Sequence, residues 1–449
     1  MRIDDRELST LELESTLFFP VSANPLGFNH IAAAELMLAA HPRWRRVVFI
    51  LSNGRHPDPT KSNAELSPAQ RLALAEAVVQ AVADPQRSHF AKLAQQAETP
   101  LHVSPQALCL STVEFPHSRP VPTVETVGTI LAGRAAQAAQ VNWFAGSDLI
   151  RRMADPLIFA DDDVRILTQS CRYAILERPG DPLAAALDEF TRRRGLTLAH
   201  DAHDASAAPE WLSNYLHLSS TLIRHAAEAG DPLAGMLPRP AAEAIAGQGL
   251  YAQGRPVTRE LDEAGRAIGG RTRLQLVLQA LDGRLAAAAA RVAGLLVERR
   301  EAGRPHSLAV AETSAGGFLT CAFAGRAGAS RYFRQGRFAY DQVAKEALIG
   351  AQGDIASSVS GQMVAAMAQG LRAQALTDFA LAESGMAGPP DGRRRSVKSG
   401  ASWIALATPQ GTHTEQAQLN PFLTRKEHQY EFALHAVGML ENWLLAHRD

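Results

Sequence analysis

A pair of hydroxyl residues followed by a pair of glycines is the part of this 449-residue chain whose residue types could do chemistry. Thr313 and Ser314 come shortly after the apolar run Leu308–Val310, and Gly316 and Gly317 stand just before the next apolar run. This order predicts a strand, a tight turn and the start of a helix. A helix N-terminus offers N–H groups and the positive end of a dipole to an anion. A hydroxyl there can be a nucleophile, a phosphate ligand or a helix cap.

Elements that could position a ligand also occur near the N-terminus. Leu17–Val21 and Val47–Ser52 are apolar and predict buried strands, and helices are expected to start near Ile31 and at Ser67. Alternation of strand, loop and helix predicts a parallel α/β sheet, on which ligands bind at the carboxyl ends of the strands. The loop Ser22–His30 is therefore a candidate binding loop.

Length and composition describe an ordinary two- or three-domain protein. Charged residues make up 20% of the chain, with 45 Lys and Arg against 46 Asp and Glu, so neither nucleic acid nor a membrane is expected as a partner. The three cysteines are scattered and no apolar run reaches membrane-spanning length, so we expect a cytoplasmic protein without a metal site. His200–Asp204 contains metal-ligand residue types, but we interpret it as a solvated loop, with metal binding as the less favoured alternative.

Five blocks of the C-terminal third resemble the C-terminal domain of CinA, a family that includes nicotinamide mononucleotide deamidases. They occur in the family's order: AETSAGG, YDQVAKEALIG, SVSGQMVAAMAQG, ESGMAGPPDG and SGASWIALA. The resemblance covers roughly residues 285–449 and implies a second α/β domain. The helix-forming run Ala286–Ala290 is expected to lie in its opening helix.

The resemblance implies acyl chemistry at the hydroxyl pair. In the deamidases, the serine of E-S-C-T-G-G is the nucleophile and the lysine of Y-S-N-E-A-K is its base. The same register here gives Thr313 as nucleophile and Lys345 as base, and it assigns Tyr340 to the catalytic residues as well. Threonine keeps a hydroxyl but is stiff at χ1, so the chemistry is expected to be altered. The pocket is expected to be retained, because Gly388 and Arg425 match the family's residues. The resemblance assigns substrate binding to Ser314, Gly316, Gly317, Gly388 and Arg425, with water as the only co-reactant.

The N-terminal part resembles the nicotinate/nicotinamide mononucleotide adenylyltransferases. Its loop aligns with G-[ST]-F-[ND]-P-x-H-x-G-H, but Gly27 replaces the first histidine. PTVETVGTIL, VNWFAGSDLIRRM and LSSTLIRHAAEAGDPLAGMLPRPAAEAIAGQGLY extend the similarity to residue 251. The resemblance implies a Rossmann-like nucleotidyltransferase sheet that uses ATP and magnesium. It assigns nucleotide binding to Asn24, His30, Gly146, Asp148, Ser219, Ser220, Thr221 and Arg224. For the last four, a capped helix carrying a solvated arginine is the alternative.

The sequence thus predicts an α/β chain with a nucleotidyltransferase-like domain at 1–255, a linker at 256–280 and a deamidase-like domain at 281–449. Both families handle nicotinamide mononucleotide, so the expected ligand is that or a related pyridine nucleotide. The expected reaction is its hydrolysis to nicotinate mononucleotide and ammonia. The alternative is a non-catalytic nucleotide-binding or regulatory protein. Monomer and homo-oligomer both stay open.

Overall fold

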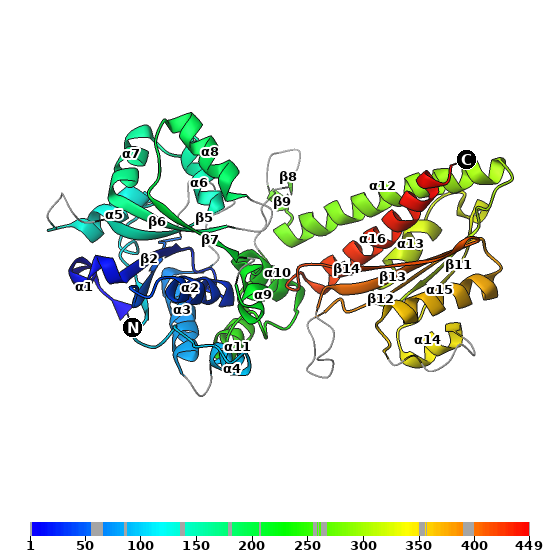
Figure 1. Cartoon of the computed structure of the whole chain (residues 1–449), viewed down its shortest axis with the longest axis horizontal. Helices are drawn as coiled ribbons and strands as arrows, with labels where there is room; N and C mark the ends of the chain where they lie inside the picture. Colours follow the sequence, from blue (N-terminus) through cyan, green and yellow to red (C-terminus); the bar gives the residue numbers. More distant parts are fainter. Residues whose placement is uncertain are drawn as a thin grey trace. The chain divides into compact units, whose positions relative to one another are not determined.

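The chain forms two compact units, Met1–Gln253 and Gly254–Asp449, shown in Figure 1. The computed structural model describes residues 2–448 except 55–65, 85–87, 135–139, 178–181, 206–207, 255–257, 259, 262–266, 350–354, 356 and 389–398. Each unit has a sheet of its own with helices on both faces, which confirms the predicted α/β class and two-domain organisation.

The first unit is built on a seven-stranded parallel sheet. Its strands are β1 (Arg2–Ile3), β2 (Thr16–Val21), β3 (Arg46–Leu51), β4 (Leu108–Ser111), β5 (Val141–Gly146), β6 (Cys171–Glu177) and β7 (His200–Asp204), in the order β1-β4-β3-β2-β5-β6-β7. The order reverses between β2 and β5, so the loops that follow these two strands leave in opposite directions. Such a switch point is where open parallel sheets bind ligands.

Strand β7 corrects one expectation. His200–Asp204 is the edge strand of this sheet rather than a solvated loop, because exposed and half-buried residues alternate along it as they do on a one-sided edge. The imidazole of His203 faces that of His41, with 2.9 Å between the two Nε2 atoms. Within the described ranges, no group of three or more His, Cys, Asp or Glu side chains could hold a metal ion.

Helices form two layers around the first sheet (Figure 1). One face carries α1 (Asp5–Thr10), α5 (Thr123–Leu131), α6 (Ser147–Ala154), α7 (Asp161–Ser170) and α8 (Leu183–Arg194), whose apolar side chains join one core cluster. The other helices are α2 (Phe28–Ala40), α3 (Pro68–Ala83), α4 (His89–Gln96), α9 (Glu210–Leu216), α10 (Ser220–Ala229) and α11 (Arg239–Gly247). The predicted strand–loop–helix alternation is confirmed, and Ser67 caps α3 as expected.

The second unit has a five-stranded mixed sheet. Its strands are β10 (Leu308–Glu312), β11 (Phe333–Phe338), β12 (Phe379–Gly385), β13 (Ala401–Thr408) and β14 (Gly411–Gln418), in the order β11-β10-β12-β13-β14. Strand β10 runs parallel to β11 and β12, whereas β12, β13 and β14 pair antiparallel. A small hairpin of β8 (Glu260–Leu261) and β9 (Ala267–Gly269) precedes them.

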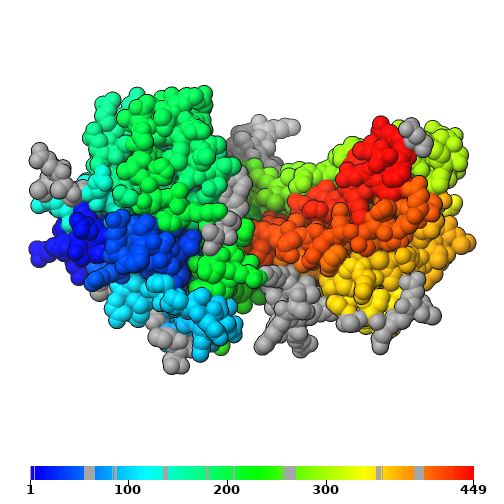
Figure 2. Space-filling view, viewed as in Figure 1, coloured from blue at the N-terminus to red at the C-terminus, as the bar shows by residue number. Residues whose placement is uncertain are grey.

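The helices of the second unit are α12 (Arg273–Glu301), α13 (Phe318–Ala324), α14 (Gln342–Ile349), α15 (Gly361–Ala375) and α16 (Arg425–Ala446). Thr272 caps α12 in a capping box, so residues 273–280 of the predicted linker are helical and the opening helix starts well before Ala286. Figure 2 shows α16 in red and β14 in orange on the visible surface of this unit. None of the helices in the described ranges is long and apolar enough to cross a membrane.

Alternation along the strands determines which helices each side chain meets. Leu308 and Val310 of β10 point to the face covered by α12, α13 and α16, together with Leu381 of β12. Ala309 and Ala382 point to the face covered by α14 and α15, where small side chains let the helices approach closely. Because the side-chain period of a strand is two, this pattern also assigns faces to the residues at the strand ends.

Candidate functional site

Two buried glutamates take up most of the backbone donors in the turn after β10. The carboxylate of Glu312 accepts hydrogen bonds from the N–H groups of Gly317 (3.0 Å), Leu319 (3.1 Å) and Thr320 (2.8 Å). It therefore fills the N-terminus of α13 from within the protein. The expectation that this glycine turn offers free N–H groups to a ligand phosphate is wrong for these three. Burial raises the pKa of Glu312, and the neighbouring Glu383 adds to that rise, while the hydrogen bonds oppose it.

Glu383, at the end of β12, fixes the other half of the turn. One carboxylate oxygen accepts from the N–H groups of Thr313 (3.3 Å) and Ala315 (2.8 Å), and the other accepts from the hydroxyls of Ser314 and Ser402. The residue is fully buried, so these four hydrogen bonds replace the ones that its carboxylate would make with water. The hydroxyl of Ser314 is thus committed to the turn, although the sequence placed it among the substrate ligands.

Thr313 differs from its neighbour. It is 4% exposed, and its hydroxyl has no hydrogen-bond partner among the residues that the structure describes. The N–H groups of Ser314 and Gly316 likewise have no acceptor within the described ranges. Of the two adjacent hydroxyls, the one at the predicted nucleophile position is the one that the fold does not use.

Lys345 lies on α14 and is buried. Its Nζ donates to the Oγ of Ser384 at 2.8 Å and to the carbonyl oxygen of Ser358 at 2.9 Å. The Ser384 hydroxyl in turn donates to the same carbonyl at 3.1 Å. The predicted base is therefore held at the carboxyl end of β12 by a serine that sequence reasoning missed.

Sheet register relates the serine that binds this lysine to Thr313. Strands β10 and β12 are parallel neighbours with Ala311 opposite Ala382, and continuing the register by two residues puts Thr313 opposite Ser384. Both side chains then belong to the α14 and α15 face, since Ala311 and Ala382 lie there. Neighbouring strands are about 4.8 Å apart, and this continued register puts Thr313 on the strand position next to Ser384, to which the amine is bound.

Three other predicted residues are also gathered together. Nη2 of Arg425 donates to the hydroxyl of Tyr340 at 3.1 Å, and a Cβ added at Gly388 would lie 3.0 Å from Nη1 of the same arginine. Arg425 is the first residue of α16, where the capping residue Thr424 precedes it. Tyr340 is 61% exposed and stands just before α14. A cation at a helix N-terminus beside an exposed phenol can bind an anionic group such as a phosphate.

The predicted phosphate ligands of the first unit also come together, but they bind their own loop. Arg224 donates through Nη1 to the carbonyl oxygen of Asn24 (2.5 Å) and through Nη2 to the Thr221 hydroxyl (3.1 Å). Ser220 donates to the carbonyl of Pro25 at 2.9 Å. Ser219 caps α10 by accepting from the N–H of Leu222, which agrees with the capped-helix alternative for this residue. The S-S-T-x-I-R segment thus anchors the loop that follows β2.

The Gly27 position, where the resembling enzymes carry a histidine, is filled. A Cβ there would lie 2.5 Å from Cδ1 of Ile223 and 2.8 Å from Oδ1 of Asn29, so a side chain would require these neighbours to move. His30 is in place at the start of α2, where its Nδ1 accepts a hydrogen bond from the N–H of Gly27 (3.1 Å). Across the switch point, Gly146 ends β5 and caps α6, and Asp148 stands in the first turn of that helix.

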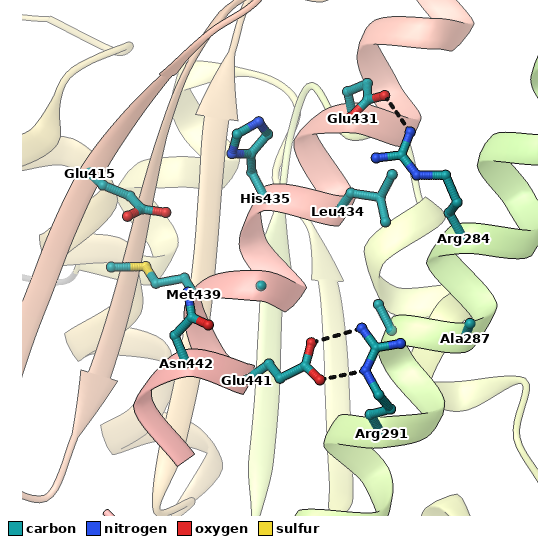
Figure 3. Close-up of a pocket in the computed structure, with 12 residues that line it drawn as sticks. Arg284, Ala287, Arg291, Glu415, Glu431, Leu434, His435, Met439, Glu441 and Asn442 are labelled. Atoms are coloured by element: carbon teal, nitrogen blue, oxygen red, sulfur yellow. Dashed lines mark hydrogen bonds and ion pairs between the residues drawn. The ribbon is translucent and has the colours of Figure 1, made fainter. Parts of the chain in front are cut away.

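The second unit also has a groove. It encloses about 470 Å³ and is lined by Arg284, Ala287, Ala288, Arg291, Glu415, Glu431, Leu434, His435, Gly438, Met439, Glu441 and Asn442 (Figure 3). Ion pairs between α12 and α16 cross its wall, Arg284 with Glu431 at 3.0 Å and Arg291 with Glu441 at 2.5 Å. No predicted site residue lines this groove.

Residues 287–444 match the family defined as the CinA C-terminal domain. This match lies within the second unit, which is therefore similar to that domain. Proteins described as CinA-like are similar to this part of the chain. The one from Shewanella amazonensis is 40% identical over 116 residues, which are 25% of this chain and 27% of that protein. The one from Acaryochloris marina is 33% identical over 158 residues, 34% of this chain and 36% of that protein. The chain thus spans only about a quarter to a third of the curated relatives that it matches.

Two solved structures are similar to the two halves of the chain. The competence damage-inducible protein A of Klebsiella pneumoniae is 26% identical, with a TM-score of 0.33, and the match covers 37% of this chain and 99% of that one. The nicotinic acid mononucleotide adenylyltransferase of Plasmodium falciparum, complexed with NaAD, is 12% identical, with a TM-score of 0.37, and the match covers 53% of this chain and 96% of that one.

Sequence reasoning did not single out Glu312, Glu383 or Ser384 as site residues. Their signal is nevertheless present, because Glu312 and Glu383 each end an apolar strand immediately before a hydroxyl residue. A charge at the end of a buried strand needs nearby donors, and a glycine turn supplies them.

Proposed function

We propose that the second unit hydrolyses the carboxamide of nicotinamide mononucleotide, giving nicotinate mononucleotide and ammonia, and that the chain serves pyridine nucleotide metabolism. The observation that supports this most directly is the hydrogen bond from Lys345 to Ser384, because the parallel register of β10 and β12, continued by two residues, pairs Ser384 with Thr313. The match to the CinA C-terminal domain also supports the proposal. The family that this part of the sequence resembles includes deamidases.

In the proposed reaction, Thr313 is the nucleophile. The neutral amine of Lys345 takes the hydroxyl proton as Oγ1 attacks the carboxamide carbon, and a tetrahedral intermediate forms. The lysine then returns the proton to the departing nitrogen, so ammonia leaves and a threonyl ester remains. Water, deprotonated by the same lysine, attacks the ester carbonyl. The lysine then gives that proton to Oγ1 of Thr313 as the ester C–O bond breaks, so the threonine hydroxyl is restored and the nicotinate carboxylic acid leaves as its carboxylate with loss of a proton to solvent. No other co-reactant is needed.

The turn and the N-terminus of α16 supply the remaining parts. We assign the oxyanion to the N–H groups of Ser314 and Gly316, because Glu312 and Glu383 already occupy the other donors of the turn. The phosphate of the mononucleotide is assigned to Arg425, whose guanidinium binds the Tyr340 hydroxyl and leaves little room for a side chain at Gly388.

The first unit fits nucleotide binding better than adenylyl transfer. The position of the catalytic imidazole is occupied by packing around Gly27, and Ser220 and Arg224 bind the loop itself. These contacts do not suit the triphosphate chemistry that ATP and magnesium would bring, so we assign no reaction to this unit. A nucleotide-binding or regulatory role is the second candidate, and the filled Gly27 position favours it for this half of the chain.

Two threonine variants test the proposal. Thr313→Ala should lower ammonia release from nicotinamide mononucleotide by at least a hundredfold while calorimetry shows unchanged affinity, because the phosphate contacts do not involve that hydroxyl. Thr313→Ser should keep or raise turnover, since a primary hydroxyl reaches the attacking rotamer more easily.

The exposed Thr414, on β14, provides the matched control, and Thr414→Ala should behave like the unchanged protein. Wild-type turnover that survives Thr313→Ala would remove this residue from the mechanism. A wild-type protein that binds the mononucleotide but releases no ammonia would favour the regulatory alternative for the whole chain.

A further inference from the structure

A buried serine and a buried lysine touch each other in the second unit. Ser384 is fully buried and Lys345 is 4% exposed, and 2.8 Å separates Oγ from Nζ. A third group, the carbonyl of Ser358, accepts from both of them, at 2.9 Å from the lysine and 3.1 Å from the serine. Amine, hydroxyl and carbonyl thus form a closed triangle.

This triangle controls where the amine lies. A lysine side chain has four rotatable bonds, and immobilising it costs up to about 2 kcal/mol of conformational entropy. Ser384 belongs to the sheet, whereas Ser358 lies in the irregular segment before α15. The serine is therefore the partner with the more rigid backbone, and it ties the amine to the strand end that lies opposite Thr313.

The same contacts affect the affinity of the amine for protons. Desolvation of a buried lysine favours its neutral form, whereas each acceptor that faces Nζ favours the ammonium. Among the described residues, the Ser358 carbonyl and the Ser384 hydroxyl are acceptors of Nζ. Removing the Ser384 hydroxyl should shift the balance toward the neutral amine and also release Nζ from its position.

We propose that Ser384 is a positioning residue that orients Lys345 toward Thr313 and sets the pH range in which the lysine is a base. The proposal rests on the function assigned to Lys345 above. Ser384 is not itself assigned as a nucleophile, because it is fully buried and its hydroxyl hydrogen already points to the Ser358 carbonyl.

The test compares three serine variants in the full-length protein. Ser384→Ala removes the hydroxyl, and Ser384→Thr retains one. Ser307→Ala is the matched control, because Ser307 is also buried and hydrogen-bonded, to Asp378, but at the opposite, amino end of the same two strands. Urea unfolding of each variant first establishes that it is folded.

Steady-state kinetics give the first readout. Ser384→Ala should lower kcat on the order of 10- to 100-fold with KM unchanged, since displacing a catalytic group by about 1 Å has effects of that size. The pH at which kcat rises should move down by about one unit, because the lost hydrogen bond stabilised the charged lysine. Ser384→Thr should restore most of kcat and the original pH profile. A purely structural role of the serine would not move the pH profile.

The second readout does not depend on turnover. The chain has five lysines, Lys61, Lys92, Lys345, Lys398 and Lys426, so NMR of protein labelled with ¹³C at lysine Cε is tractable, and Lys345→Arg assigns the signal. The Lys345 signal should titrate at lower pH in Ser384→Ala than in the wild type or Ser307→Ala. The ionisable residues on its own helix and at the nearby strand ends are unchanged in all three: Asp341 and Glu346 near or on α14, and Glu312 and Glu383 at the carboxyl ends of β10 and β12. Arg372 of α15 binds the carbonyl of Asp378 at the other end of β12.

The two readouts separate the two proposals. If the wild type releases no ammonia, the assigned reaction fails, and the NMR titration alone decides on Ser384. An unchanged Lys345 titration in Ser384→Ala overturns the positioning role whether or not the protein is active. Unchanged kcat and pH profile in an active Ser384→Ala variant overturn it as well.

Discussion

Glu383 is the residue whose replacement tests most directly how the turn after β10 is held. Its carboxylate accepts four hydrogen bonds, from two backbone N–H groups on one oxygen and two serine hydroxyls on the other. Glu383→Gln keeps the shape. The amide oxygen can face the two N–H groups while the amide NH₂ faces Ser314 and Ser402, whose hydroxyls can rotate to accept. Only the charge assistance is lost, which we expect to cost about 1–2 kcal/mol of unfolding free energy.

Glu383→Ala is different in kind. The two hydroxyls can find new partners by rotation, but the N–H groups of Thr313 and Ala315 are fixed by the backbone and lose their acceptor. Each unsatisfied buried N–H costs roughly 1–3 kcal/mol, so about 2–6 kcal/mol is expected from this pair alone. That is a large part of the stability of a typical domain, about 5–15 kcal/mol. The loss of this acceptor should also shift the turn. Ammonia release should then fall, because the N–H of Thr313 is one of the two groups that Glu383 holds in place.

Urea unfolding of the full-length protein, followed by signals of the second unit, measures both costs. Glu415→Gln is the control, since Glu415 is an exposed glutamate on β14 and its replacement should stay within about 0.5 kcal/mol of the wild type. If Glu383→Ala costs no more than Glu383→Gln, the satisfaction of backbone donors does not explain why this carboxylate is buried, and the reasoning fails.

Two further predictions concern the first unit. Gly27→Ala should lower the free energy of unfolding by about 1–3 kcal/mol, because the new Cβ would lie 2.5 Å from Cδ1 of Ile223. Ile223→Val in the same protein should recover part of that loss. If urea unfolding shows no change for Gly27→Ala, the position has room for a side chain and the prediction is wrong. Burial, opposed in part by the Thr126 hydroxyl, raises the pKa of Glu114 from 4.5 to about 7. The folded state therefore holds a proton that the unfolded state releases above pH 4.5, and stability should fall by at most about 3 kcal/mol as pH rises from 4.5 to 7. Glu114→Gln should flatten this dependence, and an identical pH–stability profile in the variant would contradict it.

The parts of the fold that could be predicted are those that local pattern specifies. The apolar runs Leu17–Val21 and Val47–Ser52 alternate with helix starts, and the structure places β2 and β3 there within one residue. His200–Asp204 was misread because an edge strand with polar residues has too little apolar alternation to be distinguished from a loop. The start of α12 was missed because residues 273–280 follow glycine- and charge-rich sequence, although Thr272 and Gln275 form a capping box.

The candidate site was harder to predict because the sequence gives residue types and not hydrogen-bond partners. Thr313 and Ser314 both carry a hydroxyl, so the sequence alone does not distinguish them. The structure does, because the carboxylate of Glu383, about seventy residues away in sequence, accepts a hydrogen bond from the Ser314 hydroxyl. Ser384 could not be linked to Lys345 without the strand register, since 39 residues separate them. Long-range pairing of this kind is set by the tertiary structure.

The two units show why matching residue types carry different functional weight. In the first unit, the polar residues of the matched motif are in place, but Ser220 and Arg224 hydrogen-bond to the carbonyls of the loop beside them. In the second unit, the carboxylate of Glu383 accepts hydrogen bonds from the Ser314 hydroxyl and the Ala315 N–H of the turn. The Thr313 hydroxyl has no hydrogen-bond partner among the described residues. A reactive group must be positioned by the fold and yet not be consumed by it. The hydroxyl of Thr313 has no partner among the described residues, and for this reason our proposal assigns the chemistry to the C-terminal unit.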